Sequence, residues 1–195
     1  MVLSGGNYFQ NTTMAKFITE NMFSTHRARW IQKWMDTLMA SYPKESARFF
    51  KDTRDPFANP VGATFKKGLE ALFDIVTAER FDAGAAAEVL EPMVRVRTIQ
   101  ELKPSQALGF IPEIKTIVQK DLRKAHQTEK DASALLQRVE GNADKSLLVA
   151  FDIYMACKKQ VFTLRAKQAR ESVGKLLIKK KLISELPDIE SELLE

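Results

Sequence analysis

Helical spacing of apolar residues is the feature that most limits what this chain can fold into. Apolar side chains recur at intervals of three and four residues in five separate stretches, and no stretch alternates convincingly between apolar and polar residues. Only 8 Gly and 7 Pro interrupt the 195 residues, which leaves few turns for a many-stranded sheet. The sequence therefore predicts an all-α fold: a single bundle of about seven helices with a long, partly projecting C-terminal helix.

The middle of the chain combines a helix start with an apolar side. Pro104 suits the first turn of a helix, where its missing N–H is no loss, and Ser105 and Gln106 can interact with the free backbone donors there. Pro112 removes one backbone hydrogen bond, so the sequence predicts a bend near it. The small and apolar residues of this stretch lie along one side of a helix: Ala107, Leu108, Phe110, Ile111, Ile114, Ile117, Val118 and Leu122.

Capping residues predict the borders of the neighbouring helices. Asn59 followed by Pro60 is an N-cap and first-turn pair for a helix that runs to about Glu79. Asp82 caps the next helix, and Pro92 within that helix can break it into two. Both helices carry apolar residues at helical spacing, so we expect them to pack in the core.

The two ends of the chain differ from its middle. Residues 1–12 have no sustained period and are set apart as a flexible leader. Ser24 is predicted to cap a second helix after a short first one. The expected division is the leader, a helical sensor or adaptor domain over residues 13–170, and a helical extension with an acidic tail over residues 171–195.

The longest helix is predicted near the C-terminus. Gly141 is expected to end one helix as its C′ residue, and Asn142 to cap the next, which runs from Ala143 to about Leu182. A break between two helices is also predicted at residues 126–128.

The formal charge of +5 is concentrated in the last third of the chain. Nine basic residues between positions 158 and 181 are accompanied by one acid, Glu171, and five acids follow within residues 185–195. An electrostatic function would therefore belong to this part. The basic residues are interpreted as a solvated helix face, with nucleic-acid binding as the alternative: Lys158, Lys159, Arg165, Lys167, Arg170, Lys175, Lys179, Lys180 and Lys181.

Residue patterns for catalysis or metal binding are missing from the sequence. His26 and His126 lack a set of ligands at helical spacing, and Cys157 is the only cysteine, expected as a small buried side chain. Phosphate-binding Gly loops and a nucleophile elbow are also absent. We expect no enzymatic activity, no metal and no cofactor, with haem ligation by a lone His as the alternative. Without a bilayer-length apolar run or a secretory signal, a cytoplasmic location is expected.

Polar and aromatic side chains close to the predicted apolar faces are the candidates for a ligand or partner pocket. Arg97 has two interpretations: an exposed or surface-paired side chain, or a buried one that holds an acidic helix end or an anionic ligand. Trp30 and Trp34 share one helix face, where a core role is the plainer interpretation. The candidate set is Trp30, Trp34, Arg97, Gln100, Ser105, Gln106 and Tyr154.

Four runs of sequence, taken in order, resemble a known family. The runs are RARWIQKWMDTLMASYPKESARFF, DPFANPVGATFKKGLEALF, MVRVRTIQELKPSQALGFIPEIKTIV and LLVAFDIYMACKKQVFTLRAKQAR. They resemble the N-terminal domain family of the RsbRD-type RsbT co-antagonists, bacterial stress-signalling regulators, over roughly residues 15–170. The most distinctive pieces are Asp55-Pro56-Phe57 with Asn59-Pro60-Val61-Gly62, and the residues from Arg97 to Gln100 followed by Pro104-Ser105-Gln106-Ala107.

This resemblance implies a helical sensory or protein-binding module that is usually attached to an output domain. No phospho-acceptor or kinase sequence follows it here, so we expect the helical module to carry over without the phosphorelay. The leading hypothesis is a non-enzymatic regulatory or adaptor domain with a protein partner and an optional small-molecule ligand. The alternatives are a structural accessory subunit of a larger electron-transfer or membrane-associated assembly, and, less favoured, a nucleic-acid-binding protein.

Self-association through the C-terminal helix is a further expectation. Its apolar stripe runs through Phe162, Ala169, Val173 and Leu176, and a long periodic helix commonly packs against a second one. The cations of two parallel copies would repel each other at low salt. We therefore expect a weak antiparallel homodimer, or an acidic tail folded back on the basic residues in a monomer.

Overall fold

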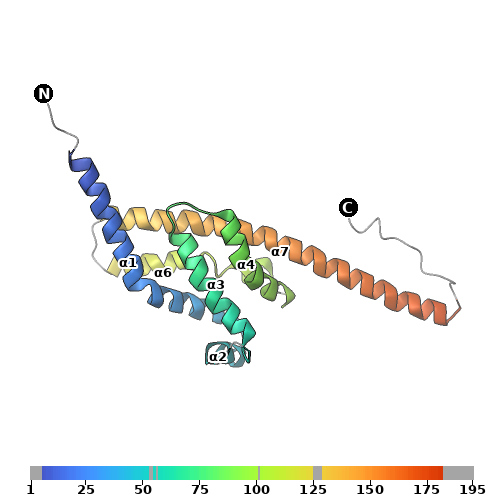
Figure 1. The fold of residues 1–195 in the computed structure, drawn as a ribbon. Helices are drawn as coiled ribbons and strands as arrows, with labels where there is room; N and C mark the ends of the chain where they lie inside the picture. Colours follow the sequence, from blue (N-terminus) through green and yellow to red (C-terminus); the bar gives the residue numbers. More distant parts are fainter. Residues whose placement is uncertain (1–5, 53–54, 56, 101, 125–128, 182–195) are drawn as a thin grey trace. The chain divides into compact units, whose positions relative to one another are not determined.

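The computed structural model describes residues 6–52, 55, 57–100, 102–124 and 129–181 (Figure 1). Within these ranges it contains seven α-helices and no strand, which confirms the predicted all-α fold. The chain divides into two units, Met1–Ile153 and Tyr154–Glu195, which are described separately. The helices are α1 (Gly6–Met39), α2 (Lys44–Asp52), α3 (Pro60–Thr77), α4 (Ala83–Ile99), α5 (Pro104–Leu108), α6 (Glu113–Lys124) and α7 (Glu129–Lys179).

The first unit is assembled around α3, which packs against α1, α2 and α4, while α1 also packs against α6 (Figure 1). Its core is apolar and aromatic because each of these helices turns its apolar side inward. The largest fully buried apolar side chains are Trp30, Trp34, Phe65, Phe73, Leu38, Met39, Leu69, Leu72, Leu90, Met93 and Ile111.

The start of α3 confirms the predicted cap. The side-chain oxygen of Asn59 accepts a hydrogen bond from the backbone N–H of Gly62 at 2.8 Å. The amide nitrogen of the same side chain donates to the carbonyl of Phe50 at 2.9 Å, so one residue both caps α3 and ties it to α2. A Cβ at position 62 would collide with these groups, which explains the glycine there. Asp82 likewise caps α4 by accepting from the N–H of Ala85 at 3.0 Å.

The predicted bend near Pro112 is a full break between α5 and α6. The backbone N–H of Ile111 donates to the carbonyl of Leu108 at 3.0 Å, and the N–H of Glu113 donates to the carbonyl of Phe110 at 3.3 Å. These three-residue turns replace the α-helical hydrogen bonds that Pro112 interrupts. The five-residue α5 and the longer α6 can therefore take different directions.

Two predicted helix breaks are wrong. Pro92 lies inside the continuous α4, where the buried neighbours Leu90, Met93 and Val94 keep the helix packed although one hydrogen bond is lost. The residue Ser24 lies inside the continuous α1, which begins at Gly6 within the segment set apart as a leader. The division into domains stays a prediction, and the predicted break at residues 126–128 lies outside the described residues.

The predicted break at Gly141 is also wrong, because α7 runs through this residue without interruption. A glycine in a helix costs only about 1 kcal/mol relative to Ala, which packing on both sides can outweigh. The Asn142 side chain does not cap a helix. It donates instead to the carbonyls of Val76 at 3.3 Å and Ala78 at 2.9 Å, and so ties α7 to the end of α3.

The described part of the second unit is the C-terminal portion of α7 and the turn that ends it. Lys180 and Lys181 donate their N–H groups to the carbonyls of Leu176 and Ile178 at 3.0 and 2.9 Å. Lys181 has a φ of 57°, the left-handed conformation with which helices commonly end. Cys157 is buried, as expected.

Candidate functional site

Arg97 is the centre of a buried polar cluster in the first unit. Its side chain is 0% exposed, so the expectation of a surface residue is wrong. Its Nε donates to the carbonyl of Ala107 at 2.7 Å, and its Nη2 donates to the carbonyl of Gln106 at 2.6 Å and to Oγ of Ser41 at 3.0 Å. The alternative interpretation, a buried Arg at the negative end of a helix, describes this arrangement. The cluster joins α4 to α5 and to the end of α1.

The shortness of α5 explains why these carbonyls need Arg97. The last carbonyls of any helix lack N–H partners within the helix, and the break after Leu108 prevents the next turn from supplying them. Arg97 provides those donors from α4. The guanidinium therefore holds the α5 to α6 junction to the rest of the core.

The surroundings of the guanidinium are aromatic. Its central carbon lies 5.2 Å from the ring centroid of Tyr42 and 5.7 Å from that of Phe110. Burial lowers the pKa of Arg97 and outweighs the opposite effect of Tyr42. Among the described residues, Arg97 forms no ion pair, and its Nη1 and the Tyr42 hydroxyl are buried without a hydrogen-bond partner. The charge is thus balanced by carbonyl dipoles and ring faces.

The two tryptophans belong to the core and use their N–H groups to fix α6 and the turn before it. Trp34 donates to the carbonyl of Phe110 at 2.6 Å, in the same turn that Arg97 approaches. Trp30 donates to Oδ2 of Asp121 at 2.7 Å. Both indoles are fully buried, so they support the site and do not present a surface for a ligand.

Asp121 is a buried carboxylate on α6 with three partners on α1. Besides Trp30, it pairs with Lys33 at 2.8 Å and with Arg29 at 2.8 Å. Burial acts to raise the pKa of Asp121, but the hydrogen bonds and charges of its partners outweigh this effect, and the pKa is lowered. The carboxylate therefore stays ionised and fastens α6 to α1.

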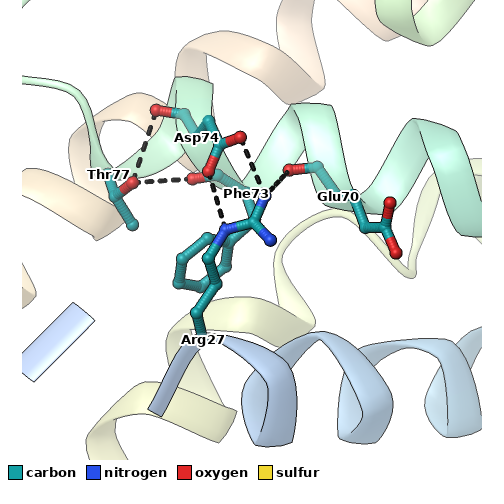
Figure 2. A network of polar contacts seen from close by, with 5 residues as sticks. All are labelled: Arg27, Glu70, Phe73, Asp74 and Thr77. Carbon is teal, nitrogen blue, oxygen red and sulfur yellow. Dashed lines mark hydrogen bonds and ion pairs between the residues drawn. The ribbon is translucent and has the colours of Figure 1, made fainter. Parts of the chain in front are cut away.

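A second link fastens α1 to α3 at the surface (Figure 2). Arg27 donates from Nε and Nη2 to the two carboxylate oxygens of Asp74 at 3.0 and 2.9 Å, and from Nη2 to the carbonyl of Glu70 at 3.2 Å. The pairing with Asp74 raises the pKa of Arg27. Thr77 donates to the carbonyl of Phe73 at 2.8 Å, and the Phe73 ring lies under the Arg27 guanidinium. Solvent screens this ion pair, so it adds little to stability, and its main effect is on the orientation of α1 relative to α3.

The predicted pocket residues are only partly brought together. Trp34, Arg97 and the backbone of Gln106 meet at the α5 to α6 junction. The Gln106 side chain is exposed and accepts from the N–H of Lys103 at 3.2 Å, while Ser105 and Gln100 are exposed. Tyr154 belongs to the second unit, where it is 3% exposed and burial raises its pKa.

Sequence reasoning missed three members of these clusters. Ser41 and Tyr42 precede Pro43, and their position at a helix end concealed their role beside Arg97. Asp121 had a detectable signal. It follows Ile117 by four residues and Val118 by three, which places a carboxylate on the apolar side of a helix.

The second unit carries an exposed apolar stripe on α7. We define it as Met155, Phe162, Ala169, Val173 and Leu176, which fall within an arc of about 60° at 3.6 residues per turn. The four larger side chains are 50%, 62%, 54% and 61% exposed, in that order. Lys158 lies in the same arc between Met155 and Phe162, so the line is apolar without interruption from Phe162 to Leu176, which is unusual on a water-facing helix.

The basic residues of α7 do not share one face. At about 100° per residue, Lys158, Lys167 and Lys175 point in three different directions. Four of the cations border the apolar stripe: Arg165 and Lys179 along one edge, and Lys159 and Arg170 along the other. The stripe therefore has positive charge on both sides.

The searched residues offer no metal site and no membrane span. No group of three or more His, Cys, Asp or Glu side chains among them is placed to hold a metal ion. None of the described helices contains a stretch that is long and apolar enough to cross a membrane.

The pattern that defines one protein family, described as the RsbT co-antagonist protein rsbRD N-terminal domain, matches residues 28–169. The chain belongs to this family. No curated protein and no solved structure matches the chain. The family is one of stress-signalling regulatory domains, and the matched range includes the Arg97 cluster, Asp121 and the first part of the apolar stripe.

Proposed function

We propose that this chain is a non-enzymatic, cytoplasmic regulatory domain in stress signalling, which binds a protein partner through the apolar stripe of α7. Family membership supports the regulatory role. The exposure of Met155, Phe162, Val173 and Leu176 along one side of a helix is the observation that carries the binding role. A second protein would remove these side chains from water, which is the main favourable term in most protein association.

The polar clusters of the first unit support a scaffold role in this proposal. Arg97 and the two tryptophans satisfy carbonyl and carboxylate groups of the core, and each of these side chains is fully buried. The rigid α5 to α6 junction that they create supports the remainder of the domain. Partner binding is therefore assigned to α7 and not to the Arg97 cluster.

Nucleic-acid binding explains less of the observed surface. Cations that follow a phosphate backbone need no line of exposed Phe, Val and Leu between them, and the cations of α7 point in several directions. Membership of a regulatory family also favours a protein partner over a structural role in an electron-transfer or membrane-associated assembly.

Site-specific photo-crosslinking in cells of the source organism tests this proposal. A photoreactive phenylalanine analogue at position 162 should yield a discrete protein adduct, because Phe162 lies in the stripe. The control is the same analogue at Gln160, an exposed position on the other side of α7. Mass spectrometry of the adduct identifies the partner. Equal labelling at both positions, or an adduct that nuclease removes, would contradict the proposal.

A further inference from the structure

The stripe on α7 follows a seven-residue repeat, and it lies entirely in the second unit. Its members Met155, Phe162, Ala169 and Leu176 are each seven residues apart, and we call these four the apolar row. A straight α-helix drifts by about 20° per seven residues, so the apolar row winds slowly around α7 over a length of about 32 Å. A second helix can follow such a row along its whole length by supercoiling around the first.

The narrowness of the stripe also indicates a helix as its occupant. The stripe residues lie within an arc of about 60°, whereas the face with which a helix packs on a globular core is about 100° wide or more. A narrow line of apolar side chains is typical of a coiled-coil seam, in which each side chain enters a hole between four residues of the partner helix. Phe162 and Leu176 are exposed, so both can fill such holes.

A second row on α7 is basic. Three positions after each member of the apolar row come Lys158, Arg165, Ser172 and Lys179, and we call these four the basic row. They occupy the second seam position of the repeat, which is apolar in most coiled coils. Glu171 is the one acid between positions 158 and 181, and it lies about 170° from the centre of the stripe. The seam therefore has an apolar row beside a positive row.

We propose that the partner of α7 is an acidic amphipathic helix with the complementary seven-residue repeat. Its apolar residues pack against the apolar row, and its Asp or Glu residues face the basic row. Burial of the apolar row supplies the main favourable free energy, while the opposite charges select the partner and fix its register. The inference rests on the proposed function, because it names the chemistry of the partner that the stripe binds.

A second copy of α7 lacks the required acids. In a parallel pair, residues of equal number face each other, so Lys158 and Lys179 would each meet an identical cation. In an antiparallel pair, the basic row of each copy would lie against the apolar row of the other and would bury charges without a partner. A different protein, with carboxylates in its seam, avoids both costs.

Binding of designed peptides to the full chain tests this chemistry. Each labelled peptide has about four heptads with Leu at every seventh position. In one peptide Glu stands three residues after each Leu, which suits parallel pairing, and in another it stands four residues after, which suits antiparallel pairing. Matched peptides carry Gln or Lys in place of every Glu. The Kd is measured by fluorescence anisotropy at a salt concentration of about 0.15 M.

Two variants of equal net charge separate the seam from general electrostatic attraction. The seam variant, Lys158→Glu with Lys179→Glu, reverses two charges of the basic row. The control variant, Lys167→Glu with Lys175→Glu, makes the same change in net charge at exposed positions on the opposite side of α7. A third variant, Phe162→Ser, removes an apolar side chain and keeps every charge. Circular dichroism checks that each variant is folded.

We expect the Glu peptide of one spacing to bind about tenfold more tightly than its Gln counterpart. The seam variant should lose this preference and bind the Lys peptide more tightly, Phe162→Ser should weaken binding of every peptide, and the control variant should behave as the wild type. Equal affinities for the Glu and Gln peptides, or equal losses in the seam and control variants, overturn the inference.

The other occupants of the stripe give different results. Self-association of the wild type that Phe162→Ser abolishes, measured by sedimentation equilibrium, assigns the stripe to a second copy. Binding to phosphatidylserine vesicles that the seam variant loses and the control variant keeps assigns it to a membrane. Both results overturn the inference.

Photo-crosslinking at position 162 remains a separate measurement of the proposed function. An adduct with a protein whose crosslinked segment lacks the acidic seven-residue repeat overturns this inference and leaves the proposed function standing. Charge-selective peptide binding without any protein adduct in cells counts against the proposed function and supports the charge preference of the seam.

Discussion

Replacing Arg97 by Met is the sharpest test of the buried cluster. The variant keeps a long apolar side chain but leaves the buried carbonyl of Ala107 and the part-buried carbonyl of Gln106 without their donors. An unsatisfied buried carbonyl costs about 1 to 3 kcal/mol. Removing a buried guanidinium recovers part of this cost, because burial of the charge is itself unfavourable. We expect a net loss of about 2 to 4 kcal/mol in the free energy of unfolding.

The assay is urea unfolding followed by tryptophan fluorescence, with circular dichroism as a second probe. Trp34 reports directly on the junction because its indole N–H donates to the carbonyl of Phe110. For a domain of this size, the expected loss lowers the melting temperature by about 4 to 16 °C. Arg97→Lys should lie between wild type and Arg97→Met, because a single ammonium group cannot reproduce the fork that binds two carbonyls.

Arg95→Met is the matched control, two residues away on the same helix. Arg95 pairs with Glu91 at 2.6 Å at an exposed position, so its loss should change the free energy of unfolding by at most about 0.5 kcal/mol. An Arg97→Met variant that is as stable as the Arg95→Met control would refute the assignment of Arg97 to the carbonyls of α5.

Three further substitutions test other contacts. Asp121→Asn should lower the free energy of unfolding by about 1 to 3 kcal/mol at pH 7. The pKa of Asp121 is lowered in the folded state, so its contribution to the free energy of unfolding is complete above the ordinary carboxyl pKa of about 4. This contribution is lost as the pH falls through the lowered pKa. A difference in stability between wild type and Asp121→Asn that stays constant from pH 7 to pH 2 in chemical denaturation would argue against the ion pairs. Gly68→Ala should cost about 1 to 3 kcal/mol by urea unfolding, since its Cβ would overlap the buried Met93, and should be less costly in a Met93→Ala background; equal costs in both backgrounds exclude this overlap. Gly141→Ala should raise the melting temperature, with a gain of about 0.5 to 1 kcal/mol, because a Cβ there meets nothing within 4 Å inside a continuous helix; a loss of stability would contradict that geometry.

Local signals in the sequence were sufficient for the helical fold and for several helix borders. The all-α class follows from apolar spacing, which depends only on the helical period. Asn59 and Asp82 were identifiable as N-caps because a capping side chain bonds to a backbone N–H three residues later. Pro112 marked the end of a helical stretch because its ring interrupts hydrogen bonds within its own turn.

Tertiary structure decided which weak breaks were overridden. Pro92 and Gly141 have the same local chemistry as true helix ends, but both helices continue through them. The local cost, about 3 kcal/mol for the proline and about 1 kcal/mol for the glycine, is therefore outweighed by the packing of the helix around each residue. The Asn142 side chain found carbonyls at the end of α3, more than sixty residues away, and these compete with a local cap. A pattern of neighbouring residues cannot reveal acceptors that lie so far away in the sequence.

The same distinction applies to the candidate site. From the residues alone, Arg97 and the residues after Pro104 could be named as candidates, and basic and apolar residues could be placed together on the last helix. The packing of the helices was needed to show that Arg97 is buried and bonded to α5, that Trp34 bonds to the same junction, and that the stripe from Met155 to Leu176 is exposed. The physical reason is that helical period tells which residues share a face, whereas burial depends on which other helix covers that face.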